Sequence, residues 1–198
     1  MSLKNRTLLA TPLAALLLAG CISFGGKAPP SLLNLTADSA PQANAVRSGS
    51  AQTALTVVIP SVPQKLRTPR VPVETGGTQV AYLKDAQWVE PPARLFQRLL
   101  SETLSASGQR LVLTETELIT GPGELLSGDL LNFNIDADTN QAVVTFQAMR
   151  LTNDGSTIAQ RRFEAREAVG ELTPANAGGA LSRAANRVAG EEALWMAQ

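Results

Sequence analysis

One cysteine, Cys21, carries the most reactive side chain in this 198-residue protein, which contains no histidine. A cysteine thiolate can attack a carbonyl carbon, bind a metal or accept a covalent modification. The lack of histidine removes the usual general base, the Ser-His-Asp arrangement and most zinc sites. The surroundings of Cys21 favour modification, because small residues precede it directly in the sequence Leu18-Ala19-Gly20-Cys21.

The residues before Cys21 have the form of a secretory signal. Lys4 and Arg6 provide a positive start, and an apolar run extends from Leu8 to Ala19. This run is too short to cross a bilayer, which requires about 20 apolar residues. The block that ends at Cys21 resembles a bacterial lipobox. The resemblance implies that lipid is attached to the sulfur, that residues 1–20 are removed, and that the new amino terminus is acylated. An ordinary signal peptide with an incidental cysteine is the alternative.

Lipidation of Cys21 would determine where the protein resides. One acyl chain binds a membrane only marginally, whereas two or more hold a protein there stably. Ile22 follows the cysteine, a position at which lipoproteins kept at the inner membrane often carry aspartate. By this resemblance we expect an anchor in the outer membrane with the protein facing the periplasm. A lipidated Cys21 leaves no thiol for disulfides, catalysis or metal binding.

Composition bounds the rest of the chain. Without Lys4 and Arg6, the mature protein has 15 basic residues (17 − 2) and 17 acidic residues, a net charge of −2. Nucleic-acid binding is not expected, because it usually requires a concentrated basic patch. We expect a lipid anchor and tether over residues 21–30 and a single domain over residues 31–198.

Hydrophobic patterning predicts a two-layer α/β sandwich, with a mixed or largely antiparallel sheet and two helices packed on one face. A helix is expected from Trp88 to Ser107, with a stripe of Leu and Phe residues on one side. A second helix is expected to begin at Thr173-Pro174. The expected strands are residues 32–35, 55–59, 79–83, 111–113, 131–136, 144–148 and 158–169, and Asn153 to Ser156 predicts a hairpin turn.

The segment from Pro60 to Val73 contains four prolines and shows no clear packing period. We expect it to be extended, since each proline removes a donor and restricts the residue before it. Two of its apolar residues, Leu66 and Val71, are candidates for partner contact, with folding back onto the sheet edge as the alternative. Tyr82 and Trp88 are further partner candidates, although large aromatics near a helix start are more often core residues.

Three other motifs are better explained by structure than by chemistry. Residues 136–140 imitate the start of a calcium loop but lack its later ligands, so we interpret them as a polar hairpin tip. Glu115 and Glu117 are interpreted as solvated charges rather than a catalytic pair. Residues 121–123 lack the lysine of a phosphate loop. No cofactor or metal is therefore expected.

Several motifs together resemble one protein family. They are Arg70-Val71, Ala81-Tyr82-Leu83-Lys84-Asp85-Ala86-Gln87-Trp88, Arg94-Leu95, Ser107-Gly108-Gln109-Arg110, Leu131 to Asp136, Ile158 to Phe163, and Trp195. On these residues the chain resembles the ABC-type transport auxiliary lipoproteins, a family that includes PqiC-like intermembrane transport lipoproteins. It is most similar to the form found in alphaproteobacterial lipid-import systems. Asn132 and Asn134 depart from the pattern, which carries more charge there.

The resemblance implies a non-enzymatic accessory subunit. Its partners would be the permease, the ATPase and the MCE-domain subunit of a lipid transport system, and the subunit could also form homo-oligomers. An alternative is a structural or assembly lipoprotein of an outer-membrane complex that handles no lipid. A hydrolase is disfavoured by the absence of histidine and of a free thiol.

Overall fold

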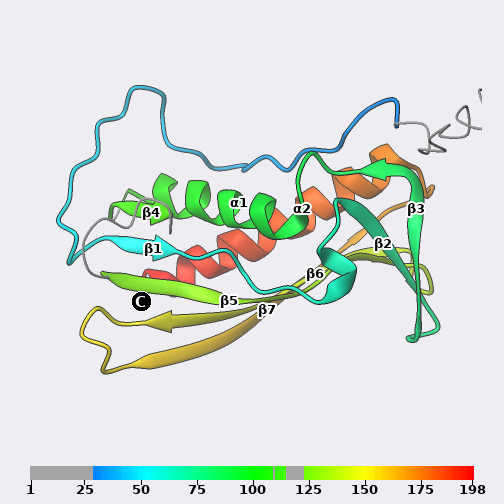
Figure 1. The fold of residues 1–198 in the computed structure, drawn as a ribbon. Helices are drawn as coiled ribbons and strands as arrows, with labels where there is room; N and C mark the ends of the chain where they lie inside the picture. The colour runs from blue at the N-terminus through cyan, green and yellow to red at the C-terminus, as the bar shows by residue number, and fades with distance from the viewer. Residues whose placement is uncertain (1–28, 109, 115–122) are drawn as a thin grey trace, which may run out of the picture.

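The computed structural model describes residues 29–108, 110–114 and 123–198. Cys21, the pair Glu115 and Glu117, and Gly121 lie outside these residues. The elements are β1 (Leu55–Val57), η2 (Gln64–Leu66), β2 (Arg70–Thr75), β3 (Gln79–Gln87), α1 (Pro92–Ala106), β4 (Val112–Thr114), β5 (Glu124–Asp136), β6 (Gln141–Leu151), β7 (Ile158–Ala168) and α2 (Pro174–Met196). Two helices pack against a curled mixed sheet, as the patterning predicts (Figure 1).

Strand β5 organises the sheet that the described residues form. One side of β5 pairs with β6 along its length, and β6 pairs with β7, so these three strands form an antiparallel meander. The other side pairs in parallel with β1 at the start of β5 and with β2 at its end. Beyond these, β4 joins β1 in parallel and β3 joins β2 in antiparallel. The sheet is therefore mixed.

The proline-rich segment connects β1 to β2 in the sequence and runs alongside β5. Ser61 forms an isolated parallel bridge with Asp129. Its amide donates to the Gly128 carbonyl at 2.9 Å, and its carbonyl accepts from the Leu130 amide at 2.9 Å. The segment is extended, as predicted, and it lies against the sheet edge. Proline interrupts regular pairing here, because it cannot donate to a ladder.

Helix α1 begins four residues later than predicted. Pro92 is its first residue, whereas Trp88 lies before it in an isolated bridge with Leu33. A proline disfavours helical geometry in the residue before it, so Pro91-Pro92 sets the helix start. Trp88 is held in its extended position by the hydrogen bond from its amide to the Pro69 carbonyl at 2.7 Å. The predicted strand at residues 32–35 is reduced to this one bridge.

The core lies between the helices and the sheet. The predicted α1 stripe is buried, and the Phe96 ring meets the Phe146 ring of β6 edge-on at 5.2 Å between centroids. Trp88 meets Phe133 of β5 in the same manner at 5.4 Å. Such edge-to-face pairs contribute about 0.5–1.5 kcal/mol beyond the area they bury. These contacts lock the helix layer onto the central strands.

Residues 29–53, here called the strap, cross the outer side of both helices (Figure 1). Its Leu33 packs on α2 at Gly178, where a Cβ would lie 2.7 Å from a leucine methyl carbon. Farther along, the Asn186 side chain donates to the Thr36 carbonyl at 3.0 Å. Arg47 then donates to the Ser105 carbonyl of α1. The strap has almost no regular secondary structure, yet these contacts give it a defined course.

Candidate functional site

Three of the four residues predicted for partner contact lie inside the domain. Leu66 and Val71 are fully buried, and Trp88 is 1% exposed. They belong to the same hydrophobic cluster as Phe96 and Phe133. The structure therefore favours the alternative prediction, in which the proline-rich segment folds back and Trp88 packs in the core. Their side chains are not available at the surface of this chain.

Tyr82 remains the surface candidate. It lies on β3, which pairs only with β2 among the described strands and so leaves an edge. The guanidinium of Arg70 stacks 4.2 Å from the Tyr82 ring centroid, and the hydroxyl donates to the Lys65 carbonyl at 3.4 Å. Val80 shares the Tyr82 face of the strand, because alternate residues point to one side, and is 50% exposed. These two side chains form the β3 patch.

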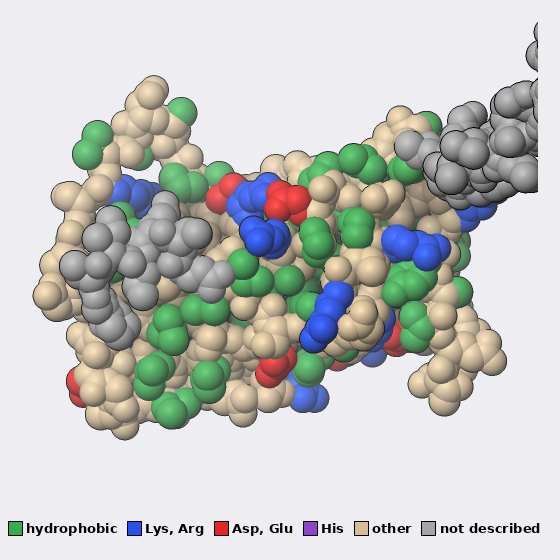
Figure 2. Space-filling model, in the orientation of Figure 1, with side chains coloured by type: hydrophobic (Ala, Val, Ile, Leu, Met, Phe, Trp, Pro, Cys, Tyr) green, Lys and Arg blue, Asp and Glu red, His purple; other side chains and the backbone are tan. Residues whose placement is uncertain are grey.

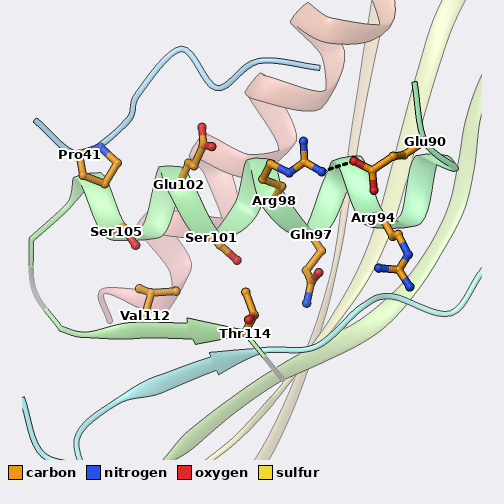
Figure 3. A pocket seen from close by; sticks show the side chains of 10 residues that line it. All are labelled: Pro41, Glu90, Arg94, Gln97, Arg98, Ser101, Glu102, Ser105, Val112 and Thr114. Carbon is orange, nitrogen blue, oxygen red and sulfur yellow. Dashed lines mark hydrogen bonds and ion pairs between the residues drawn. The ribbon is translucent and has the colours of Figure 1, made fainter. Parts of the chain in front are cut away.

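A cavity of about 290 Å³, here called the α1 cavity, lies between α1, β4 and the strap (Figure 3). The Gln97 amide donates to the Val57 carbonyl at 2.9 Å, and the Ser101 hydroxyl is buried with no partner among the described residues. The described residues that line the α1 cavity are Pro41, Glu90, Arg94, Gln97, Arg98, Ser101, Glu102, Ser105, Val112 and Thr114.

Charges in the α1 cavity cancel. Arg98 pairs with Glu90, and the remaining two charged residues, Arg94 and Glu102, are of opposite sign. Figure 2 shows acidic and basic side chains side by side over α1, and Figure 3 labels the four residues. The described lining of the α1 cavity therefore carries no net charge to attract an ionic ligand.

The sheet face away from the helices carries a continuous polar network across five elements, η2, β2, β5, β6 and β7. Lys65 donates to Glu74 and, at 2.9 Å, to Asn132. The Asn132 amide donates to the Thr145 hydroxyl at 3.2 Å, and that hydroxyl donates to Glu164 at 3.0 Å. Arg166 completes the network by donating to Glu164 and Asp136. Such cross-strand pairs stabilise a sheet, and this face is polar rather than suited to an acyl chain.

The hairpin between β5 and β6 has the polar tip that the sequence predicts. Asp136 Oδ1 accepts the amides of Asp138 and Thr139 at 3.0 and 3.2 Å, so the carboxylate caps the turn. Within the residues that the structure describes, no three His, Cys, Asp or Glu side chains gather as a metal site would require.

Glu192 is a buried carboxyl that the sequence patterning missed. It lies on the buried side of α2 between Val188 and Met196, one turn away on either side. It is fully buried, and neither carboxyl oxygen has a hydrogen-bond partner among the described residues. Burial raises the pKa of Glu192 to about 8, because an apolar environment disfavours the charged form.

This burial predicts a loss of stability as pH rises. Above the usual Glu pKa of 4.5 the unfolded chain loses its proton, whereas folded Glu192 keeps it until about pH 8. The contribution of Glu192 to the free energy of unfolding is therefore fully present below pH 4.5. Between pH 4.5 and about pH 8 it falls by up to about 1.4 kcal/mol per pH unit. Urea unfolding at pH 5, 6.5 and 8 measures this decline. Glu192→Gln should abolish most of it, and an equal decline in the variant would contradict the assignment.

A family model described as the ABC-type transport auxiliary lipoprotein component matches residues 34–193. The chain belongs to this family. The match covers the strap from Asn34, the whole sheet and nearly all of α2. Membership makes the protein an auxiliary lipoprotein of ABC-type transport systems, which implies association with transporter components and a non-catalytic role.

Two of the solved structures that match have the same fold at low sequence identity. Protein XCC0632 from Xanthomonas campestris, assigned to DUF330, is 19% identical with a TM-score of 0.69, covering 84% of this chain and 94% of that one. An uncharacterized protein is 15% identical with a TM-score of 0.63, covering 73% and 92%. A PelC dodecamer from Paraburkholderia phytofirmans is 12% identical with a TM-score of 0.39, covering 72% and 94%. No curated protein sequence matches the chain.

The auxiliary lipoprotein has no membrane-spanning helix in its described part, since none there is both long and apolar enough. A lipid-anchored envelope protein is consistent with this finding and with the family.

Proposed function

We propose that this auxiliary lipoprotein is a non-catalytic, periplasm-facing subunit of an ABC transport system that moves lipids. In this role it docks on the MCE-domain subunit, which works with the permease and ATPase, and Cys21 anchors it in the outer membrane. The observation that carries the proposal is the family match over residues 34–193, which takes in nearly all of the described fold. The lipobox resemblance at Cys21 supports the anchor.

The place where the described chain begins supports an orientation of the domain relative to the membrane. The described chain begins at the end of the molecule that holds the β2–β3 turn, opposite the carboxyl terminus (Figure 1). The segment from Cys21 to Pro29 reaches at most about 29 Å when fully extended. A lipid on Cys21 would therefore hold this end close to the membrane, and the β3 patch with it.

The lining of the α1 cavity favours docking over lipid carriage. Polar and charged side chains form most of the lining of the α1 cavity, with Pro41 and Val112 as its apolar members. Sites for apolar ligands are lined predominantly by hydrophobic and aromatic side chains. In this proposal the lipid travels through the partner subunits, and the auxiliary lipoprotein positions them.

The alternative function is a structural or assembly lipoprotein that handles no lipid, and the polar cavities also suit this role. Purification through the tagged auxiliary lipoprotein, followed by native mass spectrometry, separates the two. Recovery of the MCE-domain subunit, permease and ATPase supports the transport role. Recovery of an outer-membrane assembly without these three subunits supports the alternative.

The β3 patch provides a sharper test of docking. Val80→Asp and Tyr82→Ala should each reduce recovery of the MCE-domain subunit at least tenfold, because a buried charge or a lost aromatic anchor disrupts an interface centre. The matched control is Val46→Asp on the strap, where the valine is 95% exposed. Circular dichroism should show all three variants folded. Equal recovery with Val80→Asp and Val46→Asp would exclude the patch.

A further inference from the structure

Two arginines share one glutamate at the end of the sheet where β5 begins and β6 ends. Arg110 Nη1 donates to one carboxylate oxygen of Glu124, and Arg150 Nε donates to the other. The side chains of Arg110, Arg150 and Glu124 are 25%, 22% and 12% exposed, so the group is partly withdrawn from water. Within this cluster of three described residues, one carboxylate neutralises one guanidinium and one positive charge is left over.

All three side chains of this cluster line a cavity, and some of the arginine donors are unused among the described residues. Among the described residues Arg110 makes one more hydrogen bond, at 3.4 Å to the Met196 carbonyl in the last turn of α2. Among the described residues Arg150 uses only Nε, so both of its terminal nitrogens have no acceptor there. The cavity measures about 300 Å³, and its lining is Gln52, Thr53, Arg110, Glu124, Arg150, Thr152 and Asn153.

The chemistry of this lining selects an anion. Burial lowers the pKa of Arg110, because a site withdrawn from water disfavours the charged form. The charge of Arg150 lowers it further, because two cations close together repel each other. A bound anion relieves that repulsion. Every described residue of the lining is polar or charged, so the cavity suits an oxygen-rich group and not an acyl chain. The planar fork of arginine matches phosphate oxygens in pairs.

We propose that the Arg110–Glu124–Arg150 cavity is a phosphate-binding site, for free phosphate or for the phosphodiester of a lipid headgroup. It lies at the opposite end of the molecule from the start of the described chain (Figure 1). It differs from the α1 cavity, where two arginines and two glutamates cancel. The site does not depend on the proposed function, because its chemistry would hold phosphate in any complex.

Titration of the full-length protein in a neutral detergent tests the site, with ionic strength held constant by NaCl. The probes are inorganic phosphate, glycerophosphoglycerol as a headgroup without acyl chains, and acetate. Saturable binding of either phosphate compound, at least tenfold tighter than acetate, supports the site. Binding of glycerophosphoglycerol assigns it to headgroups, and binding of inorganic phosphate alone assigns it to the free ion. Equal binding of acetate, or no saturable binding, overturns the proposal.

Two variants remove the same charge at different places. Arg150→Gln should weaken phosphate binding at least tenfold, whereas Arg162→Gln on the exposed face of β7 should change it less than twofold. Glu124 keeps Arg110 as its partner in Arg150→Gln, so no buried carboxylate is left unpaired and the fold should persist. Arg150→Lys, which keeps the charge but loses the planar fork, should bind more weakly than the unaltered protein. Equal losses in Arg150→Gln and Arg162→Gln would overturn the proposal.

Discussion

Replacing Cys21 by serine should leave an unlipidated precursor that retains residues 1–20. A serine hydroxyl does not replace the thiol that the lipobox resemblance requires for lipid attachment. One acyl chain gives only marginal, reversible membrane binding, whereas the several chains that the lipobox resemblance implies at Cys21 hold a protein there stably, and the serine variant would lack the chains on sulfur and the acylated amino terminus alike. The effect on the mature, anchored form should therefore be all or none. Intact mass of the purified protein reports both the missing lipid and the retained signal.

A neighbouring substitution controls for disturbance of the signal region. Ser23→Ala changes a small polar residue two positions after Cys21 and should leave lipidation and detergent partition unchanged. The lipoprotein assignment of Cys21 fails if Cys21→Ser is cleaved and partitions into detergent as the unaltered protein does.

Replacing Phe96 by alanine should destabilise the domain by about 3–5 kcal/mol, the usual cost of truncating a buried phenylalanine. Phe96 is fully buried on α1 and contacts the Phe146 ring of β6, so the cavity would open between the two layers. Total stability of a domain is about 5–15 kcal/mol, which makes this a large share. Thermal unfolding followed by circular dichroism should show a midpoint lower by roughly 6–20 °C.

An exposed leucine provides the matched control for this truncation. Leu194 lies on α2 and is 71% exposed, so Leu194→Ala should change the free energy of unfolding by no more than about 0.5 kcal/mol. Similar midpoints for Phe96→Ala and Leu194→Ala would mean that α1 presents a different face to the sheet.

The fold class and the helices were predictable because their signals are local. The stripe on α1 repeats with the helical period, and Thr173 caps α2 with a 3.3 Å hydrogen bond from the Asn176 amide. The turn after β6 also follows from its residues, since Gly155 has a positive φ of 69°. The predicted helix start at Trp88 was wrong, because apolar residues before Pro92, including Trp88 itself, continue the apolar stripe without being helical.

The partner surface could not be read from the sequence. Leu66 and Val71 lie among prolines that break any period, so only the course of the chain beside β5 shows that both are buried. The sequence places the start of this strand at Leu131, whereas β5 begins at Glu124. The first half of β5 has no strict alternation of apolar and polar residues that would predict a strand. Its parallel pairing with β1 determines its structure.

The sequence by itself determined the amphipathic helices, the hairpin strands and the single cysteine behind an apolar run. Tertiary structure decided which charged side chains meet. Arg110 and Arg150 lie 14 and 26 residues from Glu124, and the pairing of β5 with β6 and the course of the chain before β4 bring them together. Glu192 is likewise exceptional only because its side of α2 is buried. Periodicity reports which face of one element is apolar, whereas ion pairs and buried charges depend on what another element places opposite that face.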